Sequence, residues 1–215
     1  MEVSIRQKKS AKIKILVLRS MLVLMGRKQF KELYVDQICE HTKISKVTLF
    51  KYFPQKEDIL LYYYRVWCLE TTIKMAESKK EGLDNVKAIF DRLAQVYEEH
   101  PGLWLSLISY LTSLTRPPAP FPLKQIEREL LFPEVENVAQ YDALSLPQLL
   151  EKYLLEAVFR GQIKRSSDTK ELSLLFLTTL YGSLVTCHLR QVDSLQVMFK
   201  RHIGILMDGL NPQNL

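Results

Sequence analysis

Apolar side chains recur every three or four residues along most of this chain, which is the spacing of amphipathic α-helices. Glycines interrupt the pattern, and we expect helices to end at Gly26, Gly82 and Gly161. The pattern predicts an all-α fold of about nine or ten helices. Their expected ranges are 10–26, 35–41, 45–53, 55–80, 83–99, 103–115, 123–132, 147–160, 169–189 and 194–209.

The least regular parts of the chain are its beginning and its middle. Residues 1–9 are polar and basic, so we expect a loose arm there, followed by Ser10 as the cap of the first helix. The segment from Arg116 to Pro147 contains six prolines. We expect one short helix within that segment and irregular chain that wraps the surface on either side of it.

Two short helices near the N-terminus form the most specific pattern. Apolar residues share one helical face in residues 35–39 and again in residues 49–53. Thr42, Lys43 and Ile44 separate the two helices, and the Ser45 side chain can accept from the free backbone N–H groups at the start of the second. This is the layout of a helix-turn-helix, whose second helix can lie in the major groove of DNA.

Residues 44–60, ISKVTLFKYFPQKEDIL, resemble the signature of TetR-type (TetR/AcrR) transcriptional regulators. In that signature, a recognition helix with hydroxyl and aromatic positions in fixed register is followed by a lysine and acidic residues that begin the next helix. The resemblance implies a helix-turn-helix DNA-binding domain of three helices over residues 1–54. It implies a helical effector-binding and dimerisation domain over residues 55–215.

Three positions depart from the family's pattern. Phe50 stands where the family usually has a tyrosine that contacts phosphate, so its ring is left for packing. Tyr34 precedes the second helix, where a capping threonine is usual, and Lys43 lies in the turn, where a small residue is common. These differences predict an altered grip on DNA with the fold retained.

The helix-turn-helix pattern and the resemblance together place candidate DNA contacts on the second short helix and around it. Val47 can meet a thymine methyl group. Lys56 lies at the start of the following helix, where free backbone N–H groups also favour a phosphate. The candidate DNA-binding residues are Lys43, Ser45, Lys46, Val47, Thr48, Lys51, Tyr52 and Lys56.

The distribution of charge agrees with this placement. The chain has a net charge of +6, yet residues 1–56 hold 13 Lys and Arg against 4 Asp and Glu, and the remainder holds 17 against 20. A cationic module on a mildly acidic body is the pattern expected for binding to a phosphate backbone. A lysine-rich surface that only confers solubility is the alternative.

The helix expected over residues 169–189 is apolar around more than half of its circumference, which leaves one face in need of a partner. A wholly intramolecular core is one solution. The resemblance implies the other, a two-fold homodimer in which the last two helices of each subunit form a four-helix bundle. The candidate dimer contacts are Leu177, Leu180, Tyr181, Leu184, Val197, Met198 and Ile205.

The resemblance also implies an internal cavity in the second domain, and apolar walls suit a small hydrophobic effector. The candidate ligand-binding residues are Trp67, Phe90, Trp104, Ile108 and Phe176. Each of them is also the kind of residue that fills an ordinary core.

Other chemistry is sparse. Three isolated cysteines and four scattered histidines predict no disulfide framework, metal site or cofactor, and they fit a reducing, cytoplasmic setting. The chain has no Gly-rich phosphate loop and no G-x-S-x-G motif, so we expect no enzymatic activity. No uninterrupted apolar run reaches the roughly 18 residues of a membrane span.

The sequence therefore predicts a sequence-specific DNA-binding transcriptional regulator. We expect a repressor that binds a palindromic double-stranded operator as a homodimer and is released by a small hydrophobic effector. The alternative is a helical protein-interaction module whose helix-turn-helix has become degenerate.

Overall fold

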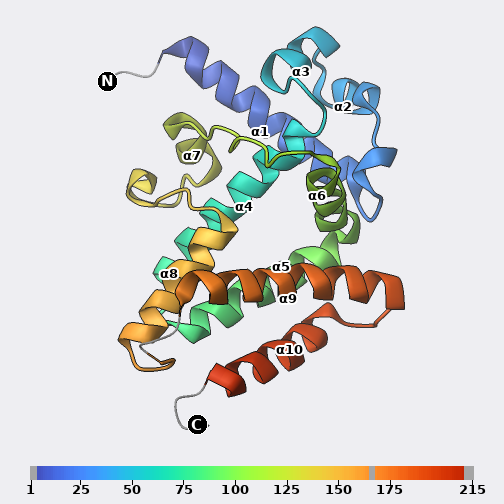
Figure 1. The fold of residues 1–215 in the computed structure, drawn as a ribbon. Helices are drawn as coiled ribbons and strands as arrows, with labels where there is room; N and C mark the ends of the chain where they lie inside the picture. Colours follow the sequence, from blue (N-terminus) through green and yellow to red (C-terminus); the bar gives the residue numbers. More distant parts are fainter. Residues whose placement is uncertain (1–3, 165–167, 211–215) are drawn as a thin grey trace. The chain divides into compact units, whose positions relative to one another are not determined.

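The computed structural model describes residues 4–164 and 168–210, and all regular secondary structure in this part of the chain is helical (Figure 1). The predicted all-α fold is confirmed. The elements are α1 (Ile5–Met25), η1 (Phe30–Glu32), α2 (Val35–Thr42), α3 (Lys46–Tyr52), α4 (Asp58–Glu77), α5 (Leu83–Glu99), α6 (Pro101–Ser113), α7 (Gln125–Leu131), η2 (Val138–Gln140), α8 (Leu146–Phe159), α9 (Thr169–Arg190) and α10 (Leu195–Leu210).

The first helix begins earlier than its apolar pattern predicts. Residues 1–3 of the expected arm lie outside the described residues. Because α1 already begins at Ile5, the arm is wrong over residues 5–9, and so is the cap at Ser10. Ser4 caps the helix, since its Oγ accepts from the backbone N–H of Gln7 at 3.3 Å. The Gln7 Oε1 in turn accepts from the Ser4 N–H at 2.9 Å, which completes a capping box in the polar sequence.

The boundaries of α4 and α6 also differ from those expected. The structure begins α4 at Asp58, whose Oδ2 accepts from the backbone N–H of Gln55 at 2.8 Å, so residue 55 lies just outside the helix. At the other end, the Ser78 hydroxyl donates to the Met75 carbonyl at 2.9 Å and residues 78–80 are not helical. Pro101 starts α6, because the first position of a helix needs no backbone N–H donor.

The chain divides into two compact units. Unit 1 comprises residues 1–69 and 99–143, and unit 2 comprises residues 70–98 and 144–215. The helix α4 contributes residues to both. A functional boundary at residue 54 stays a prediction, whereas the compact unit that contains the helix-turn-helix also includes α6 and α7.

Unit 1 is built around α1, which packs against α2, α3 and α7 (Figure 1). Its core includes Val17 and Met21 from α1, Ile38 from α2 and Leu49 from α3, all with 0% of their surface exposed. Each short helix has too few turns to be stable alone, so burial of these side chains holds α2 and α3 in place.

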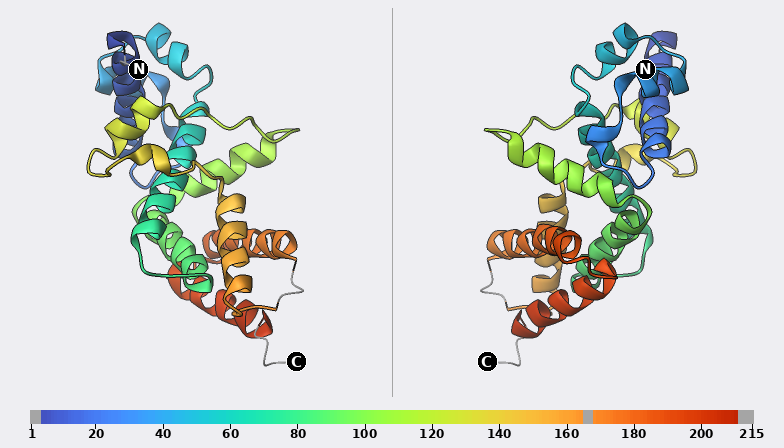
Figure 2. Two further views of the ribbon diagram at one scale, coloured as in Figure 1. Left: turned by 90° about the vertical axis from the view of Figure 1, so that its left-hand side faces the viewer. Right: turned by 90° about the vertical axis from the view of Figure 1, so that its right-hand side faces the viewer.

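Unit 2 is organised around α9, which packs against α8 and α10 (Figure 2). The ring of Phe90 on α5 meets the ring of Phe199 edge-on at 4.9 Å and that of Phe176 at 6.2 Å. By length and composition α9 is apolar enough to cross a membrane. It buries one face against α8 and α10, and its exposed side carries Leu174, Leu175 and Val185 as well as Thr178 and Thr186.

Candidate nucleic-acid interface

The start of α3 has the cap that the sequence predicts. Ser45 Oγ accepts from the backbone N–H of Thr48 at 3.1 Å and lies 2.9 Å from the Thr48 hydroxyl. Ser45 itself is exposed, whereas Thr48 is half-buried. The bond satisfies one of the free N–H groups of the first turn, so this seven-residue helix begins at a defined position.

The orientation of α3 follows from its two anchors. Leu49 and Phe53 are completely buried, which turns the opposite face of the helix to solvent. Val47 is 81% exposed. Among the other predicted DNA contacts, Lys43, Ser45, Lys46 and Lys51 are exposed, while Thr48 and Tyr52 are half-buried. The sequence thus identified an outward-facing set of side chains, whose contacts with DNA stay a prediction.

Phe50 differs from its expectation. The missing tyrosine hydroxyl suggested a ring used for packing, but 40% of the residue is exposed, so the ring lies partly on the surface beside the outward face of α3. An exposed phenyl ring can make apolar contacts with a partner but cannot donate to a phosphate.

Lys46 is paired with a carboxylate that sequence reasoning missed. Its Nζ lies 2.6 Å from Asp36 Oδ1 on α2, and both side chains are largely exposed. The hydrogen bond to Asp36, followed by the charge of Asp36, raises the pKa of Lys46. Lys46 therefore stays protonated at neutral pH, and a DNA phosphate would compete with Asp36 for its ammonium group.

The turn between α2 and α3 has a left-handed residue. Lys43 has φ 54° and ψ 37°, a conformation that favours glycine, and its backbone N–H caps the C-terminus of α2. This explains why a small residue is common at this position, and Lys43 places a long basic side chain there at a conformational cost.

A side chain within α2 replaces the missing threonine cap at the start of this helix. Tyr34 makes no side-chain cap bond, as expected, but its backbone N–H donates to Gln37 Oε1 at 2.9 Å. Thr42 Oγ1 donates to the Ile38 carbonyl at 2.6 Å near the other end of this helix. The helix is thus anchored at both ends by its own side chains, and the tyrosine ring remains exposed.

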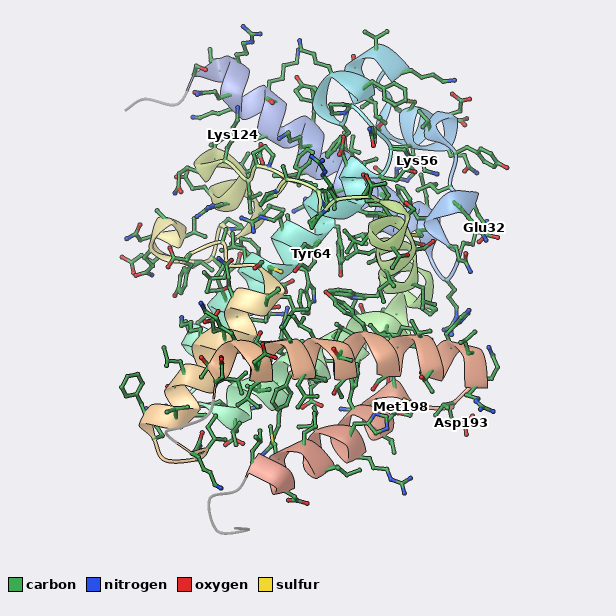
Figure 3. All side chains as sticks on the ribbon, in the orientation of Figure 1. Glu32, Lys56, Tyr64, Lys124, Asp193 and Met198 are labelled. Atoms are coloured by element: carbon green, nitrogen blue, oxygen red, sulfur yellow. The ribbon has the colours of Figure 1, made fainter. Side chains whose placement is uncertain are left out.

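Lys56 has protein partners in this structure (Figure 3). Its Nζ donates to the carbonyl of Phe30 at 2.9 Å and to that of Leu33 at 2.8 Å, and it lies 4.6 Å from the centre of the Phe30 ring. Burial lowers the pKa of this ammonium group. Since an ammonium group has three N–H donors, only one is left for a phosphate, and that contact stays a prediction.

The predicted ligand-binding residues form two separate groups. Trp67 and Trp104 are buried in unit 1, with their rings edge-to-face at 4.9 Å, and Ile108 is half-buried one turn further along α6. Phe90 and Phe176 pack together in unit 2. Neither indole N–H finds a hydrogen-bond acceptor among the described residues. At most one of the two indole N–H groups can point at the face of the other indole ring. At least one buried N–H donor therefore has no partner among the described residues.

The predicted dimer contacts are partly wrong because α9 was assigned the wrong outward face. Leu180 and Leu184 are completely buried in unit 2, and Leu177 is 7% exposed, so these side chains cannot form a contact surface. Tyr181 and Met198 are half-buried, the latter labelled on α10 in Figure 3. Val197 and Ile205 are each 65% exposed and remain candidates.

The open face of α9 and α10 contains a hollow of about 310 Å³ that sequence reasoning did not find. Its floor includes a hydrogen bond of 2.8 Å between the Ser183 hydroxyl and His202 Nδ1. The hollow is lined by Thr178, Thr179, Gly182, Ser183, Thr186, His202, Ile205 and Leu206. Repetition of small residues every three or four positions along α9 is the signal in the sequence that indicates a hollow on this face.

Elsewhere in the described residues, all three cysteines are buried thiols, and no group of three or more metal-ligating side chains occurs there.

Comparison with known proteins identifies the fold. No family model matches the chain, and no curated protein sequence matches it. Among solved structures, the chain is similar to Thermus thermophilus FadR, a TetR-family transcriptional repressor in complex with lauroyl-CoA, with a TM-score of 0.64 and 17% identity over 92% of this chain and 94% of that one.

Two further structures are similar over most of their length. E. coli NemR in its reduced form has a TM-score of 0.61 at 12% identity, over 94% of this chain and 100% of that one. CprB from Streptomyces coelicolor, a TetR-family protein solved with its operator sequence, has a TM-score of 0.56 at 17% identity, over 95% and 90% of the two chains. The chain therefore has the TetR-type fold, with a helix-turn-helix at the N-terminal end of a helical body.

Proposed function

We propose that this protein is a sequence-specific DNA-binding transcriptional regulator, most simply a repressor in the cytoplasm. The observation that carries the proposal is the outward face of α3. Buried Leu49 and Phe53 fix this helix, while Val47 and Lys51 extend from it into solvent on a TetR-type fold. The operator bound by CprB supports the same use of the helix here.

Selection of bound fragments from a genomic library tests this function. We expect one palindromic sequence, and Lys51→Ala is expected to weaken binding and to lower the dependence on salt by about one phosphate contact. Recovery of fragments without a common sequence, with binding that is only salt-sensitive, would instead support the alternative of a degenerate helix-turn-helix. The partly exposed Phe50 and the Asp36 carboxylate beside Lys46 are the features that favour this alternative.

We further propose that two copies associate through the face of α9 and α10 that carries Ile205. A palindromic site needs a two-fold protein, and an exposed apolar face beside a hollow of small residues fits a second copy of itself. Light scattering is expected to give twice the 25.1 kDa mass of the chain. Ile205→Glu should yield the monomer, whereas Leu155→Glu, at a 47% exposed position on α8, should not. A monomeric wild-type protein at micromolar concentration would contradict the proposal.

We also propose a hydrophobic effector with a hydrogen-bond acceptor, because the buried indole N–H groups of Trp67 and Trp104 have no acceptor within residues 4–164 and 168–210. Acyl-CoA is the first probe, since FadR binds lauroyl-CoA. Lauroyl-CoA is expected to raise the melting temperature and release the operator, and coenzyme A without an acyl chain serves as the control. Trp104→Phe keeps an aromatic ring, though a smaller one, and removes the N–H, so it should weaken the response. An equal response of Trp104→Phe would exclude that donor.

A further inference from the structure

The proline-rich segment between α6 and α8 returns to the helices that carry the helix-turn-helix. Its helix α7 packs along α1 within unit 1 (Figure 1). The sequence predicts a short helix over residues 123–132 without a partner for it, and in the structure Leu123 and Phe132 are each only 8% exposed and Glu127 is 1% exposed. The segment therefore contributes to the core of the DNA-binding unit even though it is about seventy residues away in sequence.

A buried ion pair connects this segment to α1. Lys14 Nζ lies 3.1 Å from Glu127 Oε1, and the two side chains are 8% and 1% exposed. The ammonium group also lies over the Phe121 ring at 5.1 Å and the Tyr62 ring at 5.5 Å. The second oxygen of Glu127 accepts from the backbone N–H of Lys124 at 3.4 Å, so the same carboxylate also caps α7.

The environment of the pair is closed by Tyr62 of α4. Its hydroxyl is buried beside Glu127 and has no hydrogen bond of good geometry among the described residues. Burial, followed by the negative charge of Glu127, raises the pKa of Tyr62, so this residue stays neutral. A charged pair in such surroundings is satisfied in only one relative position of α1 and α7. A buried ion pair contributes little net stability, and in some proteins a buried polar or ionic group instead fixes the register of the elements that it joins.

Phe121 extends the connection to the recognition helix. Its ring stacks on Phe53 with centres 5.5 Å apart and planes 20° apart, and it meets Tyr62 edge-on at 5.6 Å. Phe53 is the residue at which α3 ends, and its backbone N–H donates to the Leu49 carbonyl at 2.9 Å. A side chain from residue 121 thus supports the C-terminal end of the helix that faces DNA.

We propose that Phe121 and Glu127 are positioning residues of the DNA-binding unit, which hold α3 and α1 in the arrangement that reads an operator. The proposal rests on the DNA-binding function proposed above. Beyond Ala143 the chain passes directly from this segment into unit 2. The chain crosses between the units at residues 69/70 in α4, at 98/99 at the end of α5 and at 143/144, and residues 121–132 lie on the segment that leads to the third crossing. This segment is therefore a covalent route by which a change in unit 2 can reach the recognition helix.

The test uses the full-length protein and four variants. Glu127→Gln removes the charge but keeps an oxygen to cap α7, and Phe121→Leu keeps an apolar side chain without the stacked ring. Glu129→Gln makes the same change of charge at an exposed position of α7 and serves as the matched control. The double variant Lys14→Met/Glu127→Gln removes both charges but keeps an oxygen to cap α7, so no buried charge is left unpaired and no ion pair fixes the register.

The first measurement, hydrogen exchange of the amides of α1 and α3, does not depend on DNA. Faster exchange in the last turn of α3 is expected for Phe121→Leu, and faster exchange in α1 for Glu127→Gln, with Glu129→Gln like the wild type. Unchanged exchange in α1 and α3 for both variants would overturn the proposal. This measurement stands even if the wild-type protein binds no DNA, a result that would remove the proposed function alone.

The second measurement compares the affinity for the selected operator with that for unrelated DNA at the same salt concentration. Both single variants are expected to lose about tenfold in operator affinity, comparable to one mismatched base pair, with little change on unrelated DNA. The double variant separates positioning from folding, because its stability should recover while its operator affinity stays low. Full recovery of operator affinity in the double variant would show that the pair only stabilises the fold and would overturn the role of Glu127.

Discussion

Lys56 provides the sharpest distinction between a residue that contacts DNA and one that holds the DNA-binding module together. The resemblance to TetR-type regulators places it at a phosphate, whereas the structure uses two of its three N–H groups on the carbonyls of Phe30 and Leu33. The perturbation that separates the two roles is Lys56→Met, which keeps an unbranched side chain and removes the ammonium group that lies over the Phe30 ring.

The expected loss of stability follows from the two hydrogen bonds. A bond from a charged donor contributes about 1.5–3 kcal/mol, and a lost donor leaves its acceptor carbonyl to find water. Lys56 is half-buried, so water can replace part of each bond, and we expect Lys56→Met to lower the free energy of unfolding by about 2–3 kcal/mol in total. Lys51→Met makes the same chemical change at an exposed position and should alter stability by less than about 0.5 kcal/mol.

Urea unfolding at a fixed protein concentration measures the stability, and titration of the operator at several salt concentrations measures the phosphate contacts. The structure predicts a lower urea midpoint for Lys56→Met and a smaller salt slope for Lys51→Met. The reasoning would be refuted if Lys56→Met unfolded like the wild type while its salt slope decreased by about one contact. Such a result would mean that the two carbonyl bonds contribute no net stability and that the ammonium group serves the DNA.

Three further predictions concern single positions in unit 1. Asp36→Asn releases Lys46 and removes a negative charge near the phosphates, so operator affinity should rise about fivefold at low salt and less at high salt, as measured by fluorescence anisotropy. Lys43→Gly relieves the left-handed conformation and should raise the free energy of unfolding by about 1 kcal/mol in urea, and an unchanged midpoint would argue against strain there. Gly102→Ala would place a Cβ 2.0 Å from the Lys28 carbonyl oxygen, so calorimetry should show a loss of about 3 kcal/mol, in contrast to Gly209→Ala, which meets nothing within 4 Å.

Local signals in the sequence were sufficient for most of the fold. The periodic apolar positions predict the number and order of the helices, and Ser45 caps α3 as its side chain suggested. The face of α3 was also correct, because the spacing of Leu49 and Phe53 determines which side is buried. The early start of α1 was missed for a related reason, since its capping box lies in polar sequence that has no apolar period.

The parts of the candidate site that escaped prediction depend on contacts between distant residues. The side chains of Phe30 and Leu33 do not indicate a hydrogen bond from Lys56, because both acceptors are backbone carbonyls. A helix that is apolar on two sides, such as α9, does not reveal which side its own unit will bury, and so Leu180 and Leu184 were assigned to a partner. Pairing of Lys14 with Glu127 spans more than a hundred residues and has no local signature.

These contacts reduce the number of basic side chains in the N-terminal region that are available to DNA phosphates. Counting residues 1–56 gives 13 basic side chains, as if all were available to phosphates. Lys14 is buried against Glu127, Lys46 is paired with Asp36, and Lys56 donates to backbone carbonyls. An ammonium group that already has a protein partner displaces no counterion from DNA unless that partner is exchanged for a phosphate. The salt dependence of operator binding should therefore report fewer contacts than the charge count suggests, with Lys43 and Lys51 as the exposed lysines of the helix-turn-helix that need no such exchange.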